Sequence, residues 1–286
     1  MQIRVENLSY AYGSKNLTVK ALDNVSLTIE EGEFFGIIGQ TGSGKSTLVQ
    51  HFNGLIKIKE NAGKVIVGEY DLTAKKCDFK GLRSKIGMVF QYPEYQLFAE
   101  TVFDDVKFGL LNFFNDLSEE EIYARVKEAL ETVGLDFDKV KDKSPFELSG
   151  GQKRRVAIAG VIVTRPEILV LDEPVAGLDP VGKREFIALL HDLHKKFVKT
   201  VVIVAHDMNL ITENCTKVAV LKQGKIKKLG TPLEIFSDYQ LIEECGLELS
   251  TTAWLTKKLK EKGVIVESDL TIDSFIDGCS RIKEGK

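Results

Sequence analysis

The sequence predicts an α/β fold: a mostly parallel sheet with helices on both faces, a small antiparallel sheet beside it, a helical insertion and a C-terminal helical extension. Three observations lead to this prediction. A glycine-rich loop lies between a short apolar run and a helical segment. Short apolar runs alternate with helical segments after residue 165, as in a parallel sheet that is covered on both faces. Between these two regions, residues 91–165 have helical rather than strand periodicity.

The N-terminal part of the chain is expected to contribute to both sheets. Residues 3–8, 21–29 and 65–67 are rich in β-branched residues and flanked by turn formers, which predicts three antiparallel strands. Residues 34–39 predict a buried strand of the main sheet, and a helix is expected over residues 45–53. The small sheet should therefore lie beside the loop that joins this strand to this helix.

The rest of the chain is predicted to divide into an insertion, the second half of the main sheet and an extension. The expected elements are insertion helices at 101–114, 118–133 and 150–163; strands at 168–171, 200–205 and 217–221; a helix at 181–197; and short tail helices at 232–236, 239–245, 252–262 and 272–276. Ser118 and the acidic residues after it predict a capping box. The predicted domains are residues 1–230, with the helical insertion at about 91–165, and residues 231–286.

Composition excludes several classes of protein. The 286 residues are 43% hydrophobic and 28% charged with a formal net charge of -3, which fits neither a disordered chain nor a basic protein that coats nucleic acid. Apolar runs are far shorter than the roughly 20 residues of a membrane-spanning helix. The N-terminal residues alternate apolar and polar, which predicts a strand rather than a signal peptide. Four widely spaced cysteines argue against a zinc site or a disulfide framework, and we expect buried thiols at Cys77, Cys215, Cys245 and Cys279.

Residues 39–46 read Gly-Gln-Thr-Gly-Ser-Gly-Lys-Ser and fit the G-x-x-x-x-G-K-[ST] phosphate-loop pattern. Its glycines let backbone N–H groups turn toward phosphates, and the positive end of the following helix adds to the attraction. Lys45 is expected to reach the β- and γ-phosphates of ATP, Ser46 to bind Mg²⁺ and Thr47 to assist at the α-phosphate. The flanking strand and helix disfavour a glycine-rich turn without a ligand. The predicted nucleotide-binding residues here are Gly39, Gln40, Thr41, Gly42, Ser43, Gly44, Lys45, Ser46 and Thr47.

Asp172 and Glu173 follow the apolar run 168–171, which is a poor place for charge unless something cationic or catalytic compensates. Asp172 is expected to bind Mg²⁺ through water, and Glu173 to act as the general base toward the attacking water. Two exposed acids at the start of a loop are the alternative. The apolar run and the upstream phosphate loop disfavour it.

Three further residues are candidates on weaker grounds. His206 follows the predicted strand 200–205, where a histidine is more often structural, but a neutral imidazole there could bind the γ-phosphate and position Glu173. Gln91 is by default a surface glutamine, yet the same sheet edge would bring its amide near Mg²⁺ and the water. Tyr12 is expected either to stack on adenine or to pack within the small sheet.

A second glycine-rich element, Leu-Ser-Gly-Gly-Gln at residues 148–152, lies far downstream of the phosphate loop. A single fold rarely brings two such elements to the same nucleotide. We therefore expect two chains to face each other, with ATP between them, so that each chain completes the site of the other.

The ordered set of motifs resembles the nucleotide-binding subunit of an ATP-binding cassette (ABC) transporter over about residues 1–230. The set comprises Tyr12, the phosphate loop, Gln91, the signature 148–152, Asp172-Glu173, Gly177-Leu178-Asp179 and His206. The resemblance implies a P-loop NTPase cassette with a RecA-like sheet, and ATPase activity coupled to transport. It also implies that Ser149, Gly150, Gly151 and Gln152 bind the nucleotide held by the opposite subunit. Ser149 and Gly151 would contact its γ-phosphate, and Asp179 would lie at the dimer interface.

A narrower resemblance is to the CbiO-like ATPases of energy-coupling factor importers, which take up vitamins and transition-metal ions. It is carried by residues 89–98 and 143–152, and residues 230–247 resemble the C-terminal extension of this family. The lead-in Ser144-Pro145-Phe146-Glu147 is more similar to the second of the two paired ATPases. Val175 departs from the threonine usual in the family, which removes a hydroxyl but no proposed ligand.

This narrower resemblance implies partners and a location. The partners would be a second ABC ATPase, a transmembrane coupling subunit and a small substrate-binding membrane subunit. A heterodimer of ATPases is favoured, although a homodimer is chemically permitted. The chain would be a peripheral protein on the cytoplasmic face of the cell membrane, and the extension 231–286 would mediate dimerisation or contact a partner. The aromatic segment 92–98 is expected either to dock a membrane subunit or to pack on the core.

Two alternative functions stay open. The chain could serve another ABC importer, for cobalt or amino acids. A soluble ABC ATPase acting in DNA repair, chromosome organisation or ribosome rescue is disfavoured, since the chain has one cassette, no heptad run and slight net acidity. We expect no nucleic-acid partner. The transported substrate would be recognised by another polypeptide and cannot be read from this one.

Overall fold

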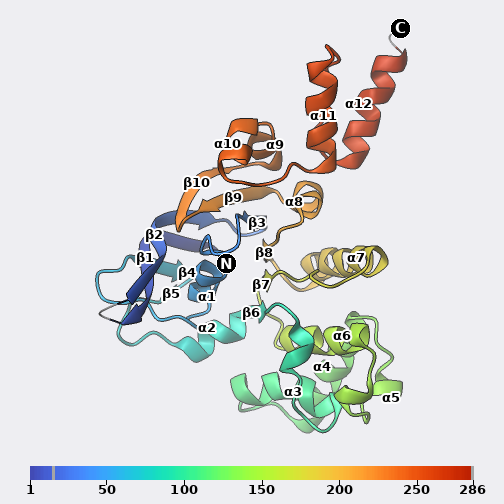
Figure 1. Cartoon of the computed structure of the whole chain (residues 1–286). Helices are drawn as coiled ribbons and strands as arrows, with labels where there is room; N and C mark the ends of the chain where they lie inside the picture. The colour runs from blue at the N-terminus through green and yellow to red at the C-terminus, as the bar shows by residue number, and fades with distance from the viewer. Residues whose placement is uncertain (15–16, 285–286) are drawn as a thin grey trace.

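The computed structural model describes residues 1–14 and 17–284 and confirms the predicted α/β architecture (Figure 1). Residues 285 and 286, the end of the predicted extension, lie outside the described residues. The strands are β1 (Ile3–Ser14), β2 (Leu17–Ile29), β3 (Phe34–Ile38), β4 (Lys64–Val67), β5 (Tyr70–Asp71), β6 (Ile86–Val89), β7 (Ile168–Asp172), β8 (Thr200–Val204), β9 (Lys217–Lys222) and β10 (Lys225–Gly230).

The main sheet has six strands in the order β10-β9-β3-β8-β7-β6. All neighbouring pairs are parallel except β9 and β10, which form an antiparallel edge. Strands β3, β7 and β8 are therefore central, and their carboxyl ends point the same way. The chain leaves each of these ends through a loop, so the residues after Ile38, Leu171 and Val204 meet at one edge of the sheet.

Alternating side chains on each strand enter two different cores, as the period of two requires. On β3, Phe34 and Ile38 pack in one core and Phe35 and Ile37 in the other. The helices between the strands are α1 (Lys45–Phe52), α2 (Phe79–Lys85), α3 (Val102–Phe113), α4 (Glu119–Thr132), α5 (Phe137–Val140), α6 (Gly150–Ile162), α7 (Pro180–Lys196) and α8 (Met208–Asn214). Helix α1 and the small sheet supply one core, while α3 to α8 supply the other. The predicted two-sided coverage is thus confirmed.

The small sheet is antiparallel, with the order β2-β1-β4-β5. Its three predicted strands are present, but β1 and β2 are much longer than expected and pair as a long ribbon that carries register shifts. In the outer half of the ribbon, Ala11 pairs with Lys20 and Tyr12 with Val19. Side chains there are half-buried or exposed, so the alternating pattern that marks a buried strand is missing from the sequence.

Helices α3 to α6 form a lobe at one end of the main sheet, drawn in green to yellow-green in Figure 1. Its core includes Val106, Leu110, Leu130 and Val156, all fully buried. Ser118 and Glu121 make the predicted capping box at the start of α4. Two 3₁₀ turns, η1 (Pro93–Gln96) and η2 (Pro145–Glu147), join this lobe to the sheet and to α6.

The C-terminal extension has two parts. Helices α9 (Pro232–Phe236) and α10 (Tyr239–Glu244) pack beside β9 and β10, whereas α11 (Thr251–Glu261) and α12 (Ile272–Glu284) project from the body of the molecule (Figure 1). Helix α12 continues beyond the predicted end at residue 276. No helix within residues 1–14 and 17–284 has both the length and the apolar character needed to cross a membrane.

The expectation of buried thiols is only half right. Cys215 and Cys245 are buried, but Cys77 and Cys279 are partly exposed. Cys77 lies in the turns before α2, and Cys279 lies on the projecting helix α12, where neighbouring elements cover less of each side chain. All four cysteines are free, as expected from their spacing.

The packing of α9 can be tested with two substitutions on one helix. Phe236 is fully buried and Leu233 is 42% exposed. We expect Phe236→Ala to lower the free energy of unfolding by about 3–5 kcal/mol, because it leaves a cavity between α9 and the sheet. Leu233→Ala should change it by less than about 0.5 kcal/mol. Urea unfolding measures both. Equal effects would show that α9 does not pack as described.

Candidate functional site

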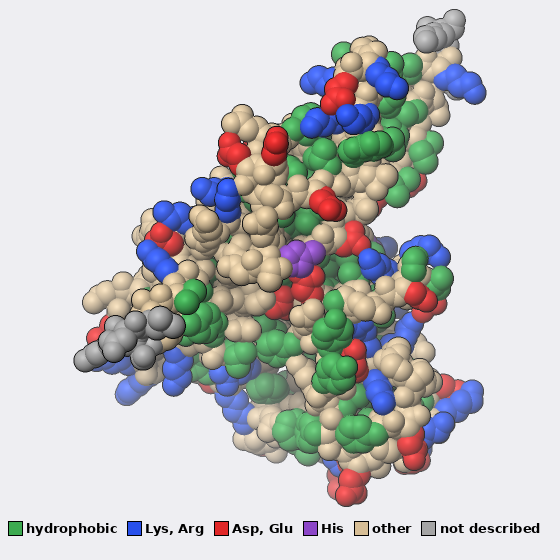
Figure 2. Space-filling view, in the orientation of Figure 1, with side chains coloured by type: hydrophobic (Ala, Val, Ile, Leu, Met, Phe, Trp, Pro, Cys, Tyr) green, Lys and Arg blue, Asp and Glu red, His purple; other side chains and the backbone are tan. Residues whose placement is uncertain are grey.

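A pocket of about 980 Å³ opens at the carboxyl ends of β3, β7 and β8. In Figure 2, a histidine side chain lies in the middle of the face, with acidic side chains next to it. Many of the residues that line the pocket lie in the loops that follow β3, β6, β7 and β8. Residues predicted for the site that line it are Tyr12, Thr41, Gly42, Gly44, Lys45, Ser46, Thr47, Gln91, Asp172, Glu173 and His206.

The phosphate loop joins β3 to α1, as the motif requires. Gly44 has φ +106°, and a Cβ on it would lie 2.3 Å from the carbonyl oxygen of Ala21 on β2. Only glycine therefore lets the loop pass so close to the small sheet. Gly44 also caps α1 without a side chain, so the first N–H groups of the helix are left for an anion. Gly39, Gln40 and Ser43 shape the loop but are not among the residues lining the pocket.

Lys45 places an ammonium group on the floor of the pocket. The residue is only 6% exposed, and Nζ donates hydrogen bonds to the carbonyl oxygens of Gly39 at 2.7 Å and Gln40 at 3.0 Å. Burial lowers the pKa of this ammonium group, and the nearby charges of Glu173 and Asp172 oppose that shift. The hydrogen-bond acceptors of Lys45 are neutral carbonyl oxygens, and a phosphate in the pocket would add a negatively charged partner.

Asp172 and Glu173 stand where β7 ends. Burial raises the pKa of Asp172. Its Oδ1 atom is buried and has no hydrogen-bond partner among the described residues. Burial also raises the pKa of Glu173 to about 7. Glu173 has φ +52°, and its N–H donates to the carbonyl of Val204 at 2.9 Å, which fixes the start of the loop against β8.

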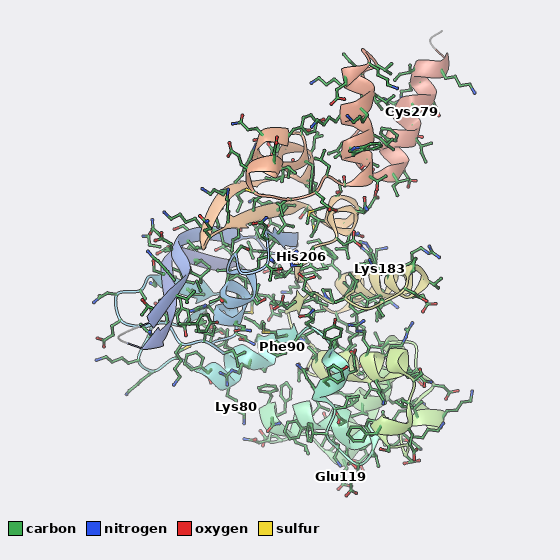
Figure 3. All side chains as sticks on the ribbon, in the orientation of Figure 1. Lys80, Phe90, Glu119, Lys183, His206 and Cys279 are labelled. Carbon is green, nitrogen blue, oxygen red and sulfur yellow. The ribbon has the colours of Figure 1, made fainter. Side chains whose placement is uncertain are left out.

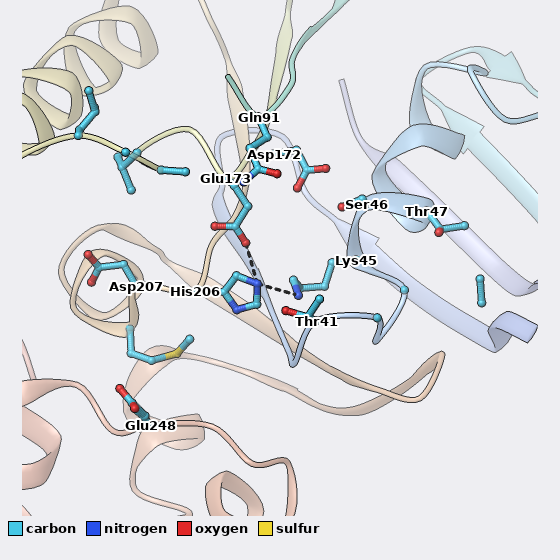
Figure 4. Close-up of a pocket in the computed structure, with 18 of the residues that line it drawn as sticks. Thr41, Lys45, Ser46, Thr47, Gln91, Asp172, Glu173, His206, Asp207 and Glu248 are labelled. Carbon is cyan, nitrogen blue, oxygen red and sulfur yellow. Dashed lines mark hydrogen bonds and ion pairs between the residues drawn. The ribbon is translucent and has the colours of Figure 1, made fainter. Parts of the chain in front are cut away.

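His206 lies between Glu173 and Lys45. Its Nε2 atom lies 3.1 Å from Oε1 of Glu173 and 3.5 Å from Nζ of Lys45, as the dashed lines in Figure 4 mark. Burial lowers the pKa of His206, and the charge of Lys45 lowers it further. The imidazole is thus kept neutral beside the ammonium group, in the state that the sequence analysis assumed.

Tyr12 and Gln91 both line the pocket, one from the small sheet and the other from the loop after β6. Tyr12 comes from β1, is 43% exposed, and its hydroxyl lies 3.2 Å from Oγ1 of Thr47. It therefore both packs in the small sheet and presents a ring to the pocket. Gln91 follows β6 and lies near Asp172 and Glu173 in Figure 4. A side chain that the sequence marks as an ordinary surface residue is here part of the site.

The signature lies elsewhere. Ser149 caps α6, accepting a hydrogen bond from the N–H of Gln152, whose side chain accepts one from the N–H of Ser149. Residues 149–152 are exposed, and none of them is among the described residues that line the pocket. Asp179 caps α7, is also exposed and lies outside the lining, although Gly177 and Leu178 belong to it. Within one chain the two glycine-rich elements do not meet.

Several lining residues were missed by sequence reasoning. Lys183 on α7 lies 3.0 Å from Asp207, which caps α8 directly after His206. The Asp207 cap is a recognisable helix-start signal that could have been read. Glu248 and Leu249, from the loop after α10, also reach the pocket, and no local sequence pattern marks them. Figure 3 shows Lys183 and His206 on neighbouring elements of the central region.

Comparisons with known proteins agree with this geometry. Residues 22–176 match a family model described as "ABC transporter". The chain is also 48% identical over 275 residues to the energy-coupling factor transporter ATP-binding protein EcfA2 of Clostridium tetani, spanning 96% of this chain and 94% of the relative. This chain belongs to the ABC transporter family, and within it to the energy-coupling factor ATP-binding proteins.

Solved structures support the family fold. A structure titled as cbiO1 from Clostridium perfringens, part of the ABC transporter complex cbiONQ, has a TM-score of 0.72 and 38% identity over 89% of this chain and 98% of its own. A dimeric ATP-binding cassette in a post-hydrolysis state, bound to ADP and Pi, has a TM-score of 0.71 and 32% identity over 80% of this chain and 98% of its own. As a member of the ABC transporter family, the chain is an ATPase and binds ATP.

The raised pKa of Glu173 predicts a pH-dependent stability of this ABC protein without nucleotide and metal. The carboxyl holds its proton more tightly in the folded chain, with a pKa of about 7 against an ordinary value of 4.5. Its ionisation therefore costs no stability below about pH 4.5, and the cost is complete above about pH 7. Glu173→Gln removes this cost, up to about 3 kcal/mol.

Urea unfolding at pH 5 and pH 8 measures this effect. We expect Glu173→Gln to stabilise the protein at pH 8 and much less at pH 5. Glu120→Gln, on the exposed start of α4, is the matched control and should change stability little at either pH. A difference between Glu173→Gln and the unsubstituted protein that stays constant with pH would contradict the assignment.

Proposed function

We propose that this chain is the ATP-hydrolysing subunit of a membrane import complex of the energy-coupling factor type, powering uptake of vitamins or transition-metal ions through separate membrane subunits. The observation that carries this proposal is the meeting of Lys45, Glu173 and His206 in one pocket while the signature lies exposed elsewhere. The name of the Clostridium tetani relative supports the transporter class.

Each part of the pocket has a proposed role toward ATP. The amides of the phosphate loop, residues 39–44, surround the phosphates, with Lys45 at the β- and γ-phosphates and Thr47 at the α-phosphate. Tyr12 offers its exposed ring to the adenine base. The pocket volume of about 980 Å³ leaves room for the whole nucleotide.

The residues present fit a Mg²⁺ ion bound together with ATP. Oδ1 of Asp172 is a buried carboxylate oxygen without a partner among the described residues, and the hydroxyl of Ser46 lies close enough to Asp172 to lower its pKa. Among the described residues, no group of three or more acidic, histidine or cysteine side chains is arranged so that it could hold a metal ion, which suits an ion that keeps waters and phosphate oxygens as ligands. Ser46, Gln91 and Asp172 would hold it. Bound there, it would neutralise charge on the phosphates.

Glu173 and His206 are proposed to act on the water that attacks the γ-phosphate. With a pKa of about 7, Glu173 is poised to accept a proton near neutral pH. Neutral His206, 3.1 Å from Glu173, fixes the direction of the carboxylate and presents its imidazole toward the phosphate side of the pocket. The water is thereby oriented and deprotonated by groups that the sheet edge has already positioned.

The site is proposed to be completed by a second ABC ATPase. Ser149, Gly150, Gly151 and Gln152 would close over the γ-phosphate held by the partner, and Asp179 would lie beside the partner's phosphate loop. A Cβ built on Gly151 meets nothing within 4 Å, so this chain alone does not require glycine there. Close approach of a partner would give that glycine a physical reason. The dimeric cassette among the similar structures supports pairing, and an unlike partner is favoured.

Membrane subunits are proposed to dock on the aromatic surface after Gln91. Tyr95 is 83% exposed and Phe98 60% exposed, and Phe98 packs edge-to-face on Phe108 of α3. Behind this surface, Glu94 lies 3.5 Å from the guanidinium of Arg154, which donates to the carbonyl of Ala176 in the pocket wall. A partner bound to this surface would thus be connected to the pocket wall through the buried side chain of Arg154. We place the chain, as a peripheral protein, on the cytoplasmic face of the cell membrane.

Two substitutions separate catalysis from binding. Glu173→Gln should keep ATP binding and lower the hydrolysis rate by several orders of magnitude, because the base acts only in the chemical step. Lys45→Ala should instead lose ATP affinity, because the γ-phosphate loses its cation. Equilibrium ATP binding and steady-state phosphate release measure the two effects. Unchanged hydrolysis by Glu173→Gln would remove its role, and full ATP affinity of Lys45→Ala would contradict the assignment of the loop.

Mixing two inactive variants tests the shared site. The test uses homodimers of this chain, which are chemically permitted although an unlike partner is favoured. When Lys45→Ala and Ser149→Arg chains pair in such a dimer, one site carries both lesions and the other is intact, so ATP hydrolysis should recover. Lys45→Ala mixed with Glu173→Gln is the matched control: both lesions fall on the phosphate-loop side, every mixed site is damaged, and no recovery is expected. Recovery in the control, or recovery by chains kept monomeric, would rule out a site shared in this way.

A further inference from the structure

Four residues form a closed ring of contacts between the small sheet and α1, three of them through side chains alone and Thr47 through its hydroxyl and its backbone carbonyl. The hydroxyl of Tyr12 lies 3.2 Å from Oγ1 of Thr47, and Nδ1 of His51 lies 2.7 Å from the carbonyl oxygen of Thr47. The rings of His51 and Tyr10 are 5.1 Å apart at 75°, and those of Tyr10 and Tyr12 are 4.9 Å apart at 85°. Starting from Tyr12, the contacts pass through Thr47, His51 and Tyr10 and return to Tyr12.

His51 is an unexpected residue for this position. It is fully buried on α1, where an apolar residue would need no hydrogen-bond partners. The carbonyl of Thr47 can only accept, so Nδ1 carries the proton and Nε2 holds the lone pair. Nε2 is buried without a partner among the residues that the structure describes. A buried polar atom without a hydrogen bond lowers the stability of the folded protein, so a histidine at this position needs an explanation.

The ring of contacts provides that explanation. An imidazole is flat, so it can meet the ring of Tyr10 at its edge while Nδ1 holds the Thr47 carbonyl. Thr47 and Tyr10 both contact the side chain of Tyr12. His51 therefore contacts both Thr47 and Tyr10, which support the only phenylalanine, tyrosine or tryptophan ring among the described residues that line the pocket. It does not itself line the pocket.

We propose that His51 is a positioning residue that fixes the ring of Tyr12 for stacking on the adenine base. The proposal rests on the proposed function, because it takes Tyr12 as the base-stacking residue. Its effect is expected at the base, because Lys45 hydrogen-bonds to the loop carbonyls of Gly39 and Gln40 rather than to His51. His51 contacts Thr47 through the backbone carbonyl and not through the side chain that is proposed for the α-phosphate. Burial lowers the pKa of His51, which agrees with a neutral ring held by a single donated hydrogen bond.

The test compares ligands with and without the base. The full-length chain with Mg²⁺ is titrated with ADP and with ribose 5-diphosphate, which lacks adenine, and the dissociation constants are measured by calorimetry. His51→Leu should weaken ADP binding roughly two- to tenfold, the range of a lost aromatic contact, and leave ribose 5-diphosphate binding unchanged. Phe52→Leu, a buried neighbour on the same helix, is the control and should alter stability without altering the ratio of the two affinities.

A double-mutant cycle tests whether His51 acts through Tyr12. Tyr12→Leu should weaken ADP binding by a similar factor, and adding His51→Leu to Tyr12→Leu should cause no further loss, because residues that act as a unit are not additive. Additive losses, or equal losses for both ligands, would overturn the proposal. If His51→Leu does not fold, Tyr10→Leu breaks the same ring from β1 and must give the same pattern.

The outcomes also separate this proposal from the proposed function. If Tyr12→Leu weakens ADP binding but neither His51→Leu nor Tyr10→Leu does, the role of His51 fails and the base-stacking role of Tyr12 stands. If Tyr12→Leu has no effect on ADP, the stacking assignment itself fails, while hydrolysis by Glu173 is tested independently by its own substitution.

Discussion

The interaction on which the rest of the structure depends is the burial of one cation beside two acids at the carboxyl edge of the main sheet. Lys45 reaches this place from the start of α1, and Asp172 and Glu173 from the end of β7, with His206 between them. Burying charges is unfavourable unless they compensate one another, so the strands that deliver them must be rigid and in register. Two hydrophobic cores, one on each face, provide that rigidity. The fold thereby keeps Lys45, Asp172 and Glu173 buried at an unfavourable cost in free energy, and a bound triphosphate with its Mg²⁺ would reduce that cost by pairing with these charges.

The same sheet explains why one chain is proposed to be incomplete. The pocket lies at the edge of the sheet, whereas the signature begins α6, in the helical lobe that the chain inserts between β6 and β7. The hydrogen bonds that satisfy Ser149 and Gln152 are local to the helix start, so the exposed glycines between them are free to meet another surface. Under the proposed function, this separation of the two elements would make ATP hydrolysis depend on association with a second ATPase.

Elements that bury one face or both faces could be predicted, and elements that do neither could not. Strands β3, β7 and β8 were found because every residue in them is buried and nearly all are apolar. The outer ribbon of β1 and β2 and the edge strand β10 are partly exposed, so their sequences lack a clear period. The same limit applies to Cys77 and Cys279, whose burial depends on neighbours far along the chain. The sequence left two roles open for Tyr12, stacking on adenine or packing within the small sheet. In the structure Tyr12 packs against Tyr10 in the small sheet and also lines the pocket.

By itself, the sequence determined the phosphate loop, the acidic pair at the end of β7 and the signature, because each is a local pattern whose chemistry requires adjacent residues. Together these patterns also determined the family. Only the tertiary structure decided that Lys183, Glu248 and Leu249 join the pocket and that Tyr10, Tyr12, Thr47 and His51 close a ring. These groupings depend on parallel strands and packed helices bringing distant segments together. A local sequence pattern does not show which distant residues come together, because their arrangement is stabilised by the burial of apolar surface over the whole domain.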